Sequence, residues 1–339
     1  MRVPPFVEWW DVLVLPSVSL LAELRISRLA RVTDMDRVGV EVVAAVRPTG
    51  HVLQVTQGKG ATFEQAAWSA VGEAAELHAA EQPQSALLRF CDAAELEGAV
   101  LDDDGLRRAW VQGRRLSDGA PVWLAAERVF CAPTGTTWLG PSMTSWSSNG
   151  FGAHSVAGRA VEHAVLELWE RHALTRALPD GWTEAALERY LVEWRSPLVD
   201  TLRSRGFQVA CCSLERSPLP LAGALLFDLE EPSVPLTAGY ACRRTTAEAL
   251  EAALLEAVQS RLTEIHGARD DVATGERESG ASLQALLSRT ATRPVRKHAR
   301  VKGWPKEVAD AVVIVRVRES PLHVVKAIGI GLEESELLR

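Results

Sequence analysis

The sequence predicts a mixed α/β protein built as a single domain. β-Branched runs, such as residues 38–46 and 312–317, alternate along the chain with long Ala/Leu/Glu-rich segments whose apolar residues recur at helical spacing. Because strands and helices interleave throughout, and no low-complexity linker divides them, one mixed domain is favoured over two separable ones. We expect that domain to occupy residues 1–339, with residues 1–30 as an N-terminal extension and residues 270–306 as a loop-rich segment.

Composition and charge narrow the class of protein. Hydrophobic residues form 47% and charged residues 24% of the 339-residue chain, a balance that allows a large buried core. The net charge of -7 gives no electrostatic basis for binding nucleic acid or anionic lipid. The most apolar N-terminal stretch, residues 9–24, is interrupted by Asp11, Pro16 and Glu23 and lacks the features of a secretory signal. We therefore expect a cytoplasmic protein with neither a membrane nor a nucleic-acid partner.

The cysteines do not indicate a zinc site or a disulfide framework. The chain has five, an odd number, and they lack paired Cys-x-x-Cys spacing and neighbouring histidines. We interpret them as small buried residues in a reducing compartment. They are Cys91, Cys131, Cys211, Cys212 and Cys242.

Strands are predicted in short β-branched or apolar runs. Residues 38–46 and 52–55 flank the turn-forming residues 47–50, which predicts a buried hairpin. The segment 270–306 is polar and carries a basic cluster, so we expect a loop with a short helix and a solvent-exposed charged face. Further strands are expected at residues 122–124, 129–130, 208–212, 219–227, 236–241, 312–317 and 323–328.

Three long predicted helices, residues 64–81, 156–177 and 246–267, share one pattern. When the helices are aligned on a glutamate, each has alanines at -7 and -3, a glutamate at 0, and a glutamate or glutamine at +3. These offsets fall on a single stripe of an α-helix, where the alanines permit close approach to a neighbour. The matched positions are Ala66, Ala70, Glu73 and Glu76; Ala160, Ala164, Glu167 and Glu170; and Ala249, Ala253, Glu256 and Gln259.

The matched stripes favour one shared site. A single Glu-x-x-Glu on a helix is usually a solvent-exposed face, but three copies with the same alanines indicate that the faces pack together. Carboxylates gathered in one place repel each other unless a cation or raised pKa values relieve the repulsion. Hard oxygen ligands suit Mg²⁺, which commonly bridges to nucleotide phosphates. The pattern therefore predicts a site for ATP and Mg²⁺.

Two glycine-containing segments lead into these helices. Gln57-Gly58-Lys59-Gly60 is expected to follow a strand, where glycines allow close approach to phosphate and Lys59 neutralises it. It is not a Walker A loop, because Leu53 stands where the first glycine belongs and Gly60 replaces the Ser or Thr. The second segment is residues 148–152. Ser69, Arg171 and Arg261 lie within about one turn of the acidic pairs, and each arginine is either a salt-bridge partner or a bidentate phosphate ligand.

These motifs together resemble the YcaO family over nearly the whole chain. Residues 78–81 and 267–271 look most like the branch whose members operate with a TfuA-type partner. The matching motifs are Arg31-Val32-Thr33 through Arg47-Pro48, Gln57-Gly58-Lys59-Gly60, Ser69-x3-Glu73-x2-Glu76, Ser148-Asn149-Gly150, Glu167-x2-Glu170-Arg171 and Glu256-x2-Gln259-Ser260-Arg261.

The resemblance implies a single YcaO-type domain, with mixed sheets packed against helices and a nucleotide site between three acidic helices. It implies ATP and Mg²⁺ as cofactors. The nucleotide-binding residues it implies are Lys59, Ser69, Glu73, Glu76, Ser155, Glu167, Glu170, Arg171, Gln259 and Arg261. The metal ligands that the resemblance and the stripe geometry together suggest are Glu73, Glu76, Glu167, Glu170 and Glu256.

The activity implied is ATP-dependent O-phosphorylation of a backbone amide in a ribosomally made peptide or protein, leading to a thioamide or an azoline. The implied partners are a peptide substrate and a TfuA-type or leader-peptide-binding protein, and the implied assembly is a homodimer. Residues 330–333 are followed by a short tail without the proline-rich terminus of many azoline-forming members, which argues against azoline formation.

Several positions depart from the family pattern and leave alternatives open. Leu77 replaces an arginine, Ser155 and Arg159 occupy the entry to the second helix where an acidic position is usual, and His172 replaces an aspartate. Arg159 is a candidate for direct phosphate binding, whereas His154 and His172 are expected to be structural. A catalytically degenerate scaffold that binds peptide or partner is the alternative function. A metal-dependent hydrolase is disfavoured, because no Gly-x-Ser-x-Gly, His-Glu-x-x-His or Cys-His constellation is present.

Overall fold

Three β-sheets each end in a strand that leads into a long helix. The computed structural model describes residues 14–100, 106–142, 145–214, 217–230, 236–267, 280–296 and 299–333. The helices are α1 (Val18–Glu23), α2 (Phe63–Glu81), α3 (Ala157–Ala177), α4 (Glu184–Tyr190), α5 (Pro197–Ser204), α6 (Thr246–His266), α7 (Gly280–Arg289) and α8 (Lys306–Ala311). The strands are β1 (Arg28–Arg31), β2 (Glu41–Val46), β3 (Val55–Gly60), β4 (Leu88–Cys91), β5 (Arg108–Arg115), β6 (Pro121–Ala125), β7 (Phe151–His154), β8 (Leu191–Glu193), β9 (Phe207–Ser213), β10 (Leu221–Asp228), β11 (Thr237–Cys242), β12 (Arg293–Pro294), β13 (Val312–Arg318) and β14 (His323–Gly329).

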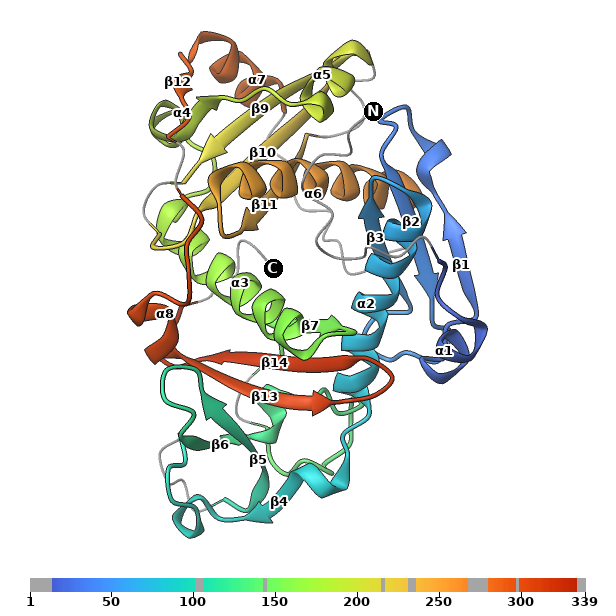
Figure 1. Ribbon diagram of the computed structural model, residues 1–339, viewed down its shortest axis with the longest axis vertical. Helices are drawn as coiled ribbons and strands as arrows, with labels where there is room; N and C mark the ends of the chain where they lie inside the picture. Colours follow the sequence, from blue (N-terminus) through green and yellow to red (C-terminus); the bar gives the residue numbers. More distant parts are fainter. Residues whose placement is uncertain are drawn as a thin grey trace.

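The sheets place β3, β7 and β11 at their edges. The strand orders are β1-β2-β3, β4-β5-β13-β14-β7 with β6 beside β5, and β11-β10-β9-β8-β12. Neighbouring strands are antiparallel apart from the short parallel pair of β12 and β8. Each of the three edge strands is followed directly by a long helix: α2 after β3, α3 after β7 and α6 after β11. Figure 1 shows these helices on three sides of the middle of the molecule, with β4, β5 and β6 at one end and α4, α5 and α7 at the other.

Glycine and alanine allow each helix to lie against its own strand. A Cβ atom at Gly58 would stand 2.0 Å from the backbone nitrogen of Ala70. At Gly152 it would stand 2.3 Å from the carbonyl oxygen of Ala160, and at Gly239 it would stand 2.2 Å from that of Ala253. Contacts this short require glycine on the strand. The alanine stripe predicted from the sequence is therefore the surface on which strand and helix meet.

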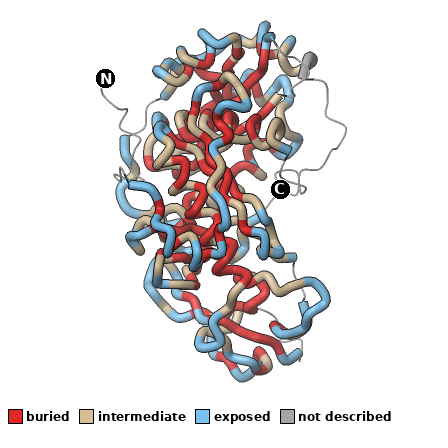
Figure 2. The backbone as a smooth tube through the Cα atoms, turned by 90° about the vertical axis from the view of Figure 1, so that its right-hand side faces the viewer, coloured by how far each residue is buried: buried red, intermediate tan, exposed pale blue. Residues whose placement is uncertain are grey.

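The three units supply the core of the molecule. The alanine faces of α2, α3 and α6 are each fully buried, and each belongs to a different hydrophobic cluster. Figure 2 shows the buried residues running along the long axis of the molecule between the exposed ends. Burial of the small apolar faces, not helix propensity alone, fixes the three helices in place.

The predicted elements are mostly found, with two differences. The hairpin is formed by β2 and β3, but residues 57–60 lie inside β3 and not after it, because Gly58 and Gly60 pack against α2. A strand at residues 129–130 was wrong: the backbone N–H groups of Val129 and Phe130 both donate to the carbonyl of Ala126, which makes a helical turn.

The two segments set apart in the sequence both contain regular structure. Residues 14–30 include α1 and most of β1, and Leu20, Leu24 and Ile26 are buried in the core beneath α2. Within residues 270–306, the described part contains α7 and β12. Of its basic cluster, Arg293, Arg296, Arg300 and Lys302 are exposed, and Lys297 and His298 lie outside the described residues. None of the helices in the described ranges has the length and apolarity that a bilayer-crossing segment requires.

Candidate nucleotide and metal site

The +3 side chains of the three helices close a ring between neighbouring units. The carboxylate of Glu76 on α2 accepts a hydrogen bond from the backbone N–H of Ala153 on β7 at 2.8 Å. Glu170 on α3 accepts one from the N–H of Cys242 on β11 at 3.1 Å. On α6, the amide of Gln259 donates to the carbonyl of Gln57 on β3 at 3.1 Å. On each edge strand, one backbone group that has no partner within the sheet is thus hydrogen-bonded to a side chain from a helix of another unit.

The remaining acidic side chains line the same ring. Glu73 accepts a hydrogen bond from the N–H of Gln57 at 3.1 Å, so the carboxylate lies along the edge of β3. Glu256 forms an ion pair with Lys59, whose ammonium also donates to the side-chain oxygen of Gln259 at 2.8 Å. The side chain of Glu256 is 39% exposed and that of Lys59 is 15% exposed, so this part of the ring is accessible from solvent.

The pKa values indicate that carboxylates of different helices lie close together. Burial raises the pKa of Glu76 well above its usual value, and the charges of Glu167 and Glu73 raise it further. Burial also raises the pKa of Glu167 to about 7, with Arg171 opposing the shift and Glu170 adding to it. These shifts follow from desolvation and like-charge repulsion in a confined space.

Carboxylates of α3 and α6 influence each other in the same way. Burial raises the pKa of Glu170, partly offset by Arg171, and the charge of Glu256 adds to the rise. Burial pushes the pKa of Glu256 upward too, but Lys59 and other cations outweigh it and hold that pKa below its usual value. The predicted acidic residues of all three helices are therefore gathered into one cluster.

The cluster is not a preformed metal cage. Among the residues that the structure describes, no three His, Cys, Asp or Glu side chains are close enough together to hold a metal ion. One oxygen each of Glu73, Glu76 and Glu170 instead accepts a backbone N–H, and one oxygen of Glu256 pairs with Lys59. Mg²⁺ normally takes one or two carboxylates and completes its shell with water and phosphate oxygens. Glu76 and Glu167 are half-buried carboxylates on different helices, and their raised pKa values fit that requirement.

Lys326 on β14 is a cation of the site that the sequence analysis missed. It is almost fully buried, and its ammonium donates to the carbonyls of Ser147 and Asn149 at 2.7 and 2.5 Å. Its charge lowers the pKa of both Glu76 and Glu167. The segment that includes Ser148-Asn149-Gly150 is thus held in place beside the acidic cluster by a lysine from a distant strand.

Arg261 is the predicted ligand that the structure places elsewhere. Its guanidinium is buried and pairs with Asp36 at 2.5 Å and with Asp228 at 2.6 Å. Successive helical residues are rotated by about 100°, so a residue two positions after Gln259 points to another side of α6. The pairing ties α6 to the turn before β2 and to β10.

The other predicted side chains lie at the ends or flanks of the helices. Arg171 lies beside Glu170, with its Nε 3.7 Å from the carboxylate. Ser69 is half-buried on α2, and Ser155 is exposed immediately before α3. Arg159 pairs with Glu162 at 3.2 Å on the first turns of α3.

The two histidines make structural contacts. The ring Nδ1 of His154 accepts a hydrogen bond from the backbone N–H of Val156 at 2.8 Å, at the start of α3. His172 accepts one from the N–H of Glu333 at 3.0 Å and lies edge-on to Trp169. His172 therefore holds the segment after β14 against α3.

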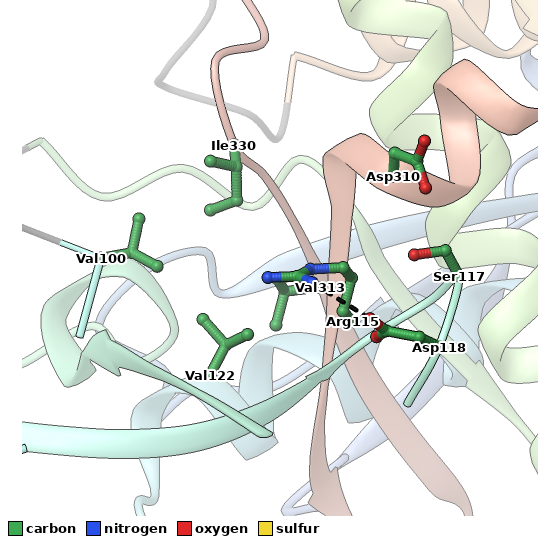
Figure 3. Close-up of a pocket in the computed structure, with 8 residues that line it drawn as sticks. All are labelled: Val100, Arg115, Ser117, Asp118, Val122, Asp310, Val313 and Ile330. Carbon is green, nitrogen blue, oxygen red and sulfur yellow. Dashed lines mark hydrogen bonds and ion pairs between the residues drawn. The ribbon is translucent and has the colours of Figure 1, made fainter. Parts of the chain in front are cut away.

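A separate surface hollow of about 300 Å³ lies on the six-stranded sheet. Figure 3 shows its lining from β5, β6, β13 and α8, with Arg115 paired to Asp118 at 3.1 Å. None of its lining residues comes from α2, α3 or α6. It is therefore distinct from the acidic cluster.

The fold and the cluster together define a class of protein. It is an α/β protein in which three strand–helix units surround half-buried carboxylates and cations suited to a polyphosphate and a divalent metal. Residues 57–313 match the model of a family described as YcaO cyclodehydratase, ATP- and Mg²⁺-binding. That match covers most of the chain, so the chain belongs to the YcaO family. ATP and Mg²⁺, expected from the sequence, are the ligands of this family.

Known proteins resemble the chain over most of its length. An uncharacterized protein of Methanothermobacter thermautotrophicus is 29% identical over 289 residues, which cover 79% of this chain and 74% of that protein. An uncharacterized protein in the tfuA 3' region of Rhizobium leguminosarum bv. trifolii is 28% identical over 278 residues, covering 74% and 65%. The solved YcaO of Methanopyrus kandleri, bound with AMPPCP and Mg²⁺, is 21% identical with a TM-score of 0.70 and covers 93% of this chain and 88% of its own. The single-domain α/β fold expected from the sequence is confirmed.

Proposed function

We propose that the chain activates a backbone amide of a ribosomally made peptide by ATP-dependent O-phosphorylation. The observation that carries the proposal is the meeting of acidic side chains from α2, α3 and α6 in one cluster with Lys59 and Arg171. Carboxylates that can bind Mg²⁺, with cations beside them that can bind phosphate, suit a magnesium-bound triphosphate. The family description supports the same reaction class.

The side chains divide into two roles. In this proposal Lys59, Arg171 and Gln259 donate hydrogen bonds to phosphate oxygens. The proposed ligands of Mg²⁺ are Glu73, Glu76, Glu167, Glu170 and Glu256. Mg²⁺ supplies neutralisation of the phosphate charge, because phosphoryl transfer depends mainly on positioning and charge stabilisation. Ser69 and Ser155 remain predicted nucleotide contacts. Arg261 acts in this proposal by fixing the position of α6.

Phosphorylation converts the amide oxygen into a better leaving group. An amide oxygen leaves poorly, so the carbonyl oxygen first attacks the γ-phosphorus of ATP, and the bond from that phosphorus to the ADP oxygen breaks. A nucleophile then adds to the amide carbon and loses its proton. The carbon–oxygen bond breaks, and the original amide oxygen departs within phosphate. Hydrogen-bond donors held rigidly around the phosphates lower the barrier because they need no reorganisation during the reaction.

We favour an external nucleophile such as sulfide, which gives a thioamide, over a side-chain nucleophile, which gives an azoline. The relative from a tfuA region and the resemblance of residues 78–81 and 267–271 to the TfuA-associated branch support this choice. A TfuA-type or leader-peptide-binding protein is the proposed partner. A homodimer and a cytoplasmic location remain predictions.

The proposal is tested with short peptides encoded by the neighbouring genes, added to the purified protein with Mg-ATP, sulfide and the co-encoded partner. We expect peptide-dependent release of ADP and phosphate. A heavy-oxygen label in the backbone carbonyl should appear in the released phosphate. Mass spectrometry should show replacement of oxygen by sulfur; loss of one water would indicate azoline formation instead.

Two outcomes would count against the proposal. Binding of Mg-ATP without turnover, in the presence of peptide and partner, would favour the alternative of a catalytically degenerate scaffold. Peptide modification without ATP would place the protein in another reaction class.

A further inference from the structure

Two adjacent arginines follow β11, and they engage different parts of the molecule. Arg243 donates a hydrogen bond through its side chain to the backbone carbonyl of Cys242 at 2.8 Å. Arg244 instead pairs with Glu162 at 2.7 Å and lies over the ring of Trp304 at 3.7 Å. Neither residue was singled out in the sequence, because a short basic pair outside a helix has no distinctive pattern.

The side chain of Arg243 lies along the free edge of β11. The backbone N–H of Arg243 points into the sheet, where it donates to the carbonyl of Pro220 at 2.9 Å. Backbone groups of the preceding residue, Cys242, therefore point the other way, out of the sheet. The N–H of Cys242 donates to Glu170, and its carbonyl accepts from Arg243. The guanidinium of Arg243 and the carboxylate of Glu170 thus flank the same strand residue.

Arg243 also lies close enough to act on the rest of the cluster. Its charge lowers the pKa of Glu170 and of Glu256, on α3 and α6. Burial lowers the pKa of His163 on α3 to about 3, and the charges of Arg243 and Lys59 contribute to that shift. Arg243 and Lys59 are therefore cations on the same side of α3.

The bonding of Arg243 differs from that of Lys59 and Arg171. Lys59 pairs with Glu256, and Arg171 lies beside Glu170. Among the described residues, the acceptor of the Arg243 guanidinium is a neutral carbonyl. Arginine has five N–H donors in a planar fork, and that fork fits two oxygens of one phosphate group. Most of the hydrogen-bonding capacity of Arg243 is thus available for a ligand.

We propose that Arg243 is a phosphate-binding residue of the site, donating hydrogen bonds from its guanidinium to the polyphosphate of the bound nucleoside triphosphate. The inference rests on the proposed function, since it requires that a nucleotide occupies the acidic cluster. The nucleotide would then be bound by residues of α2, α3 and α6 and also by a residue that follows the edge strand β11. Its charge and that of Lys59 then face the phosphates from β11 and β3.

Arg244 provides a matched control. It is the same residue type one position along the chain, but its guanidinium holds Glu162 and donates to the carbonyl of Gly303 at 2.5 Å. The backbone carbonyl of Arg244 accepts from Val301 at 3.0 Å, so this arginine fastens residues 301–304 to the start of α6. Removing it should weaken packing without removing a phosphate ligand.

The test is isothermal titration calorimetry with Mg²⁺ and a non-hydrolysable ATP analogue, on wild-type protein and the variants R243M, R243Q and R244M, with Tm measured in parallel. We expect R243M and R243Q to raise the Kd by about ten- to a hundredfold, the range for a lost charge-assisted hydrogen bond. R244M should lower Tm while leaving the Kd within about threefold of wild type.

Wild-type affinity in R243M would overturn the inference while leaving the proposed function intact. Loss of the folded state in both Arg243 variants would overturn it as well, because the residue would then be structural. Absence of nucleotide binding by the wild-type protein is a different result, which contradicts the proposed function itself.

Discussion

The glutamates of the cluster are oriented by backbone N–H groups and repelled by one another's charges, and this balance sets their pKa values. Glu73, Glu76 and Glu170 each accept a strand N–H, which orients the carboxylate without neutralising it. Burial raises the pKa of Glu76, Glu167 and Glu170. Glu256 is the exception, because Lys59 holds its pKa below the usual value. A magnesium-bound phosphate would relieve both the repulsion and the desolvation.

Replacing one glutamate by glutamine tests this role at the residue scale. Glu73→Gln and Glu256→Gln remove charge with little change of shape, so we expect loss of nucleotide turnover with Tm within a few degrees of wild type. The measurements are ADP release and calorimetric binding of Mg-ATP. Unchanged binding in both variants would exclude these residues from the site.

The raised pKa of Glu167 also predicts that the stability of the metal-free protein depends on pH. Its pKa is about 7 when folded and 4.5 ordinarily, so between these pH values the folded state keeps a proton that the unfolded state has lost. Stability should therefore fall as pH rises through this window. Glu167→Gln, which is neutral at every pH, should flatten the fall in Tm measured from pH 5 to 8. An identical slope in the variant would contradict the raised pKa.

At the scale of elements, the strand–helix unit depends on where glycine occurs. Gly58 on β3 leaves no room for a Cβ, whereas a Cβ at Gly72 within α2 would meet no atom within 4 Å. Two glycines of one unit thus have opposite expected responses to the same substitution.

Gly58→Ala should destabilise the protein by about 1–3 kcal/mol, because the added methyl forces β3 and α2 apart. Gly72→Ala should stabilise it by about 1 kcal/mol, since alanine is the better helix former. Urea unfolding of both variants measures the difference. Equal effects would show that β3 does not lie against the alanine face of α2.

Arg261 provides a second test at this scale. Arg261→Gln removes the buried cation that Asp36 and Asp228 share. Asp228 keeps its ion pair with Arg37, so the loss falls mainly on Asp36 and should cost about 3 kcal/mol of unfolding free energy. The affinity of the folded variant for Mg-ATP, measured by calorimetry at low temperature, should stay near that of wild type. A stable variant that no longer binds nucleotide would instead support the direct contact expected from the sequence.

The sequence predicts the parts of this site that lie on one helix. The stripe of alanines and glutamates is visible because helical periodicity is local. β13 and β14 are visible as β-branched runs, and β9, β10 and β11 as short apolar runs. Lys326 and Arg243 could not be found in this way, because they reach the cluster only after distant strands pair. The placement of Arg261 likewise depends on Asp36 and Asp228, which are far from it in the chain.

For the whole molecule, the main consequence of the fold is a closed arrangement of three units. Each helix packs on its own edge strand and binds the edge strand of another unit through its +3 side chain. The unpaired strand edges that would otherwise invite association are thereby satisfied inside the molecule. The same hydrogen bonds bring the carboxylates together, so the contacts that stabilise the ring also form the site.

The most direct test of this account is a crystal structure with Mn²⁺ in place of Mg²⁺ and a non-hydrolysable ATP analogue, in which anomalous scattering locates the metal. We expect manganese bound to phosphate oxygens and to glutamates of the cluster, with the triphosphate contacting residues of α2, α3 and α6. Manganese and nucleotide bound elsewhere, with these glutamates still on their backbone N–H groups, would contradict the account.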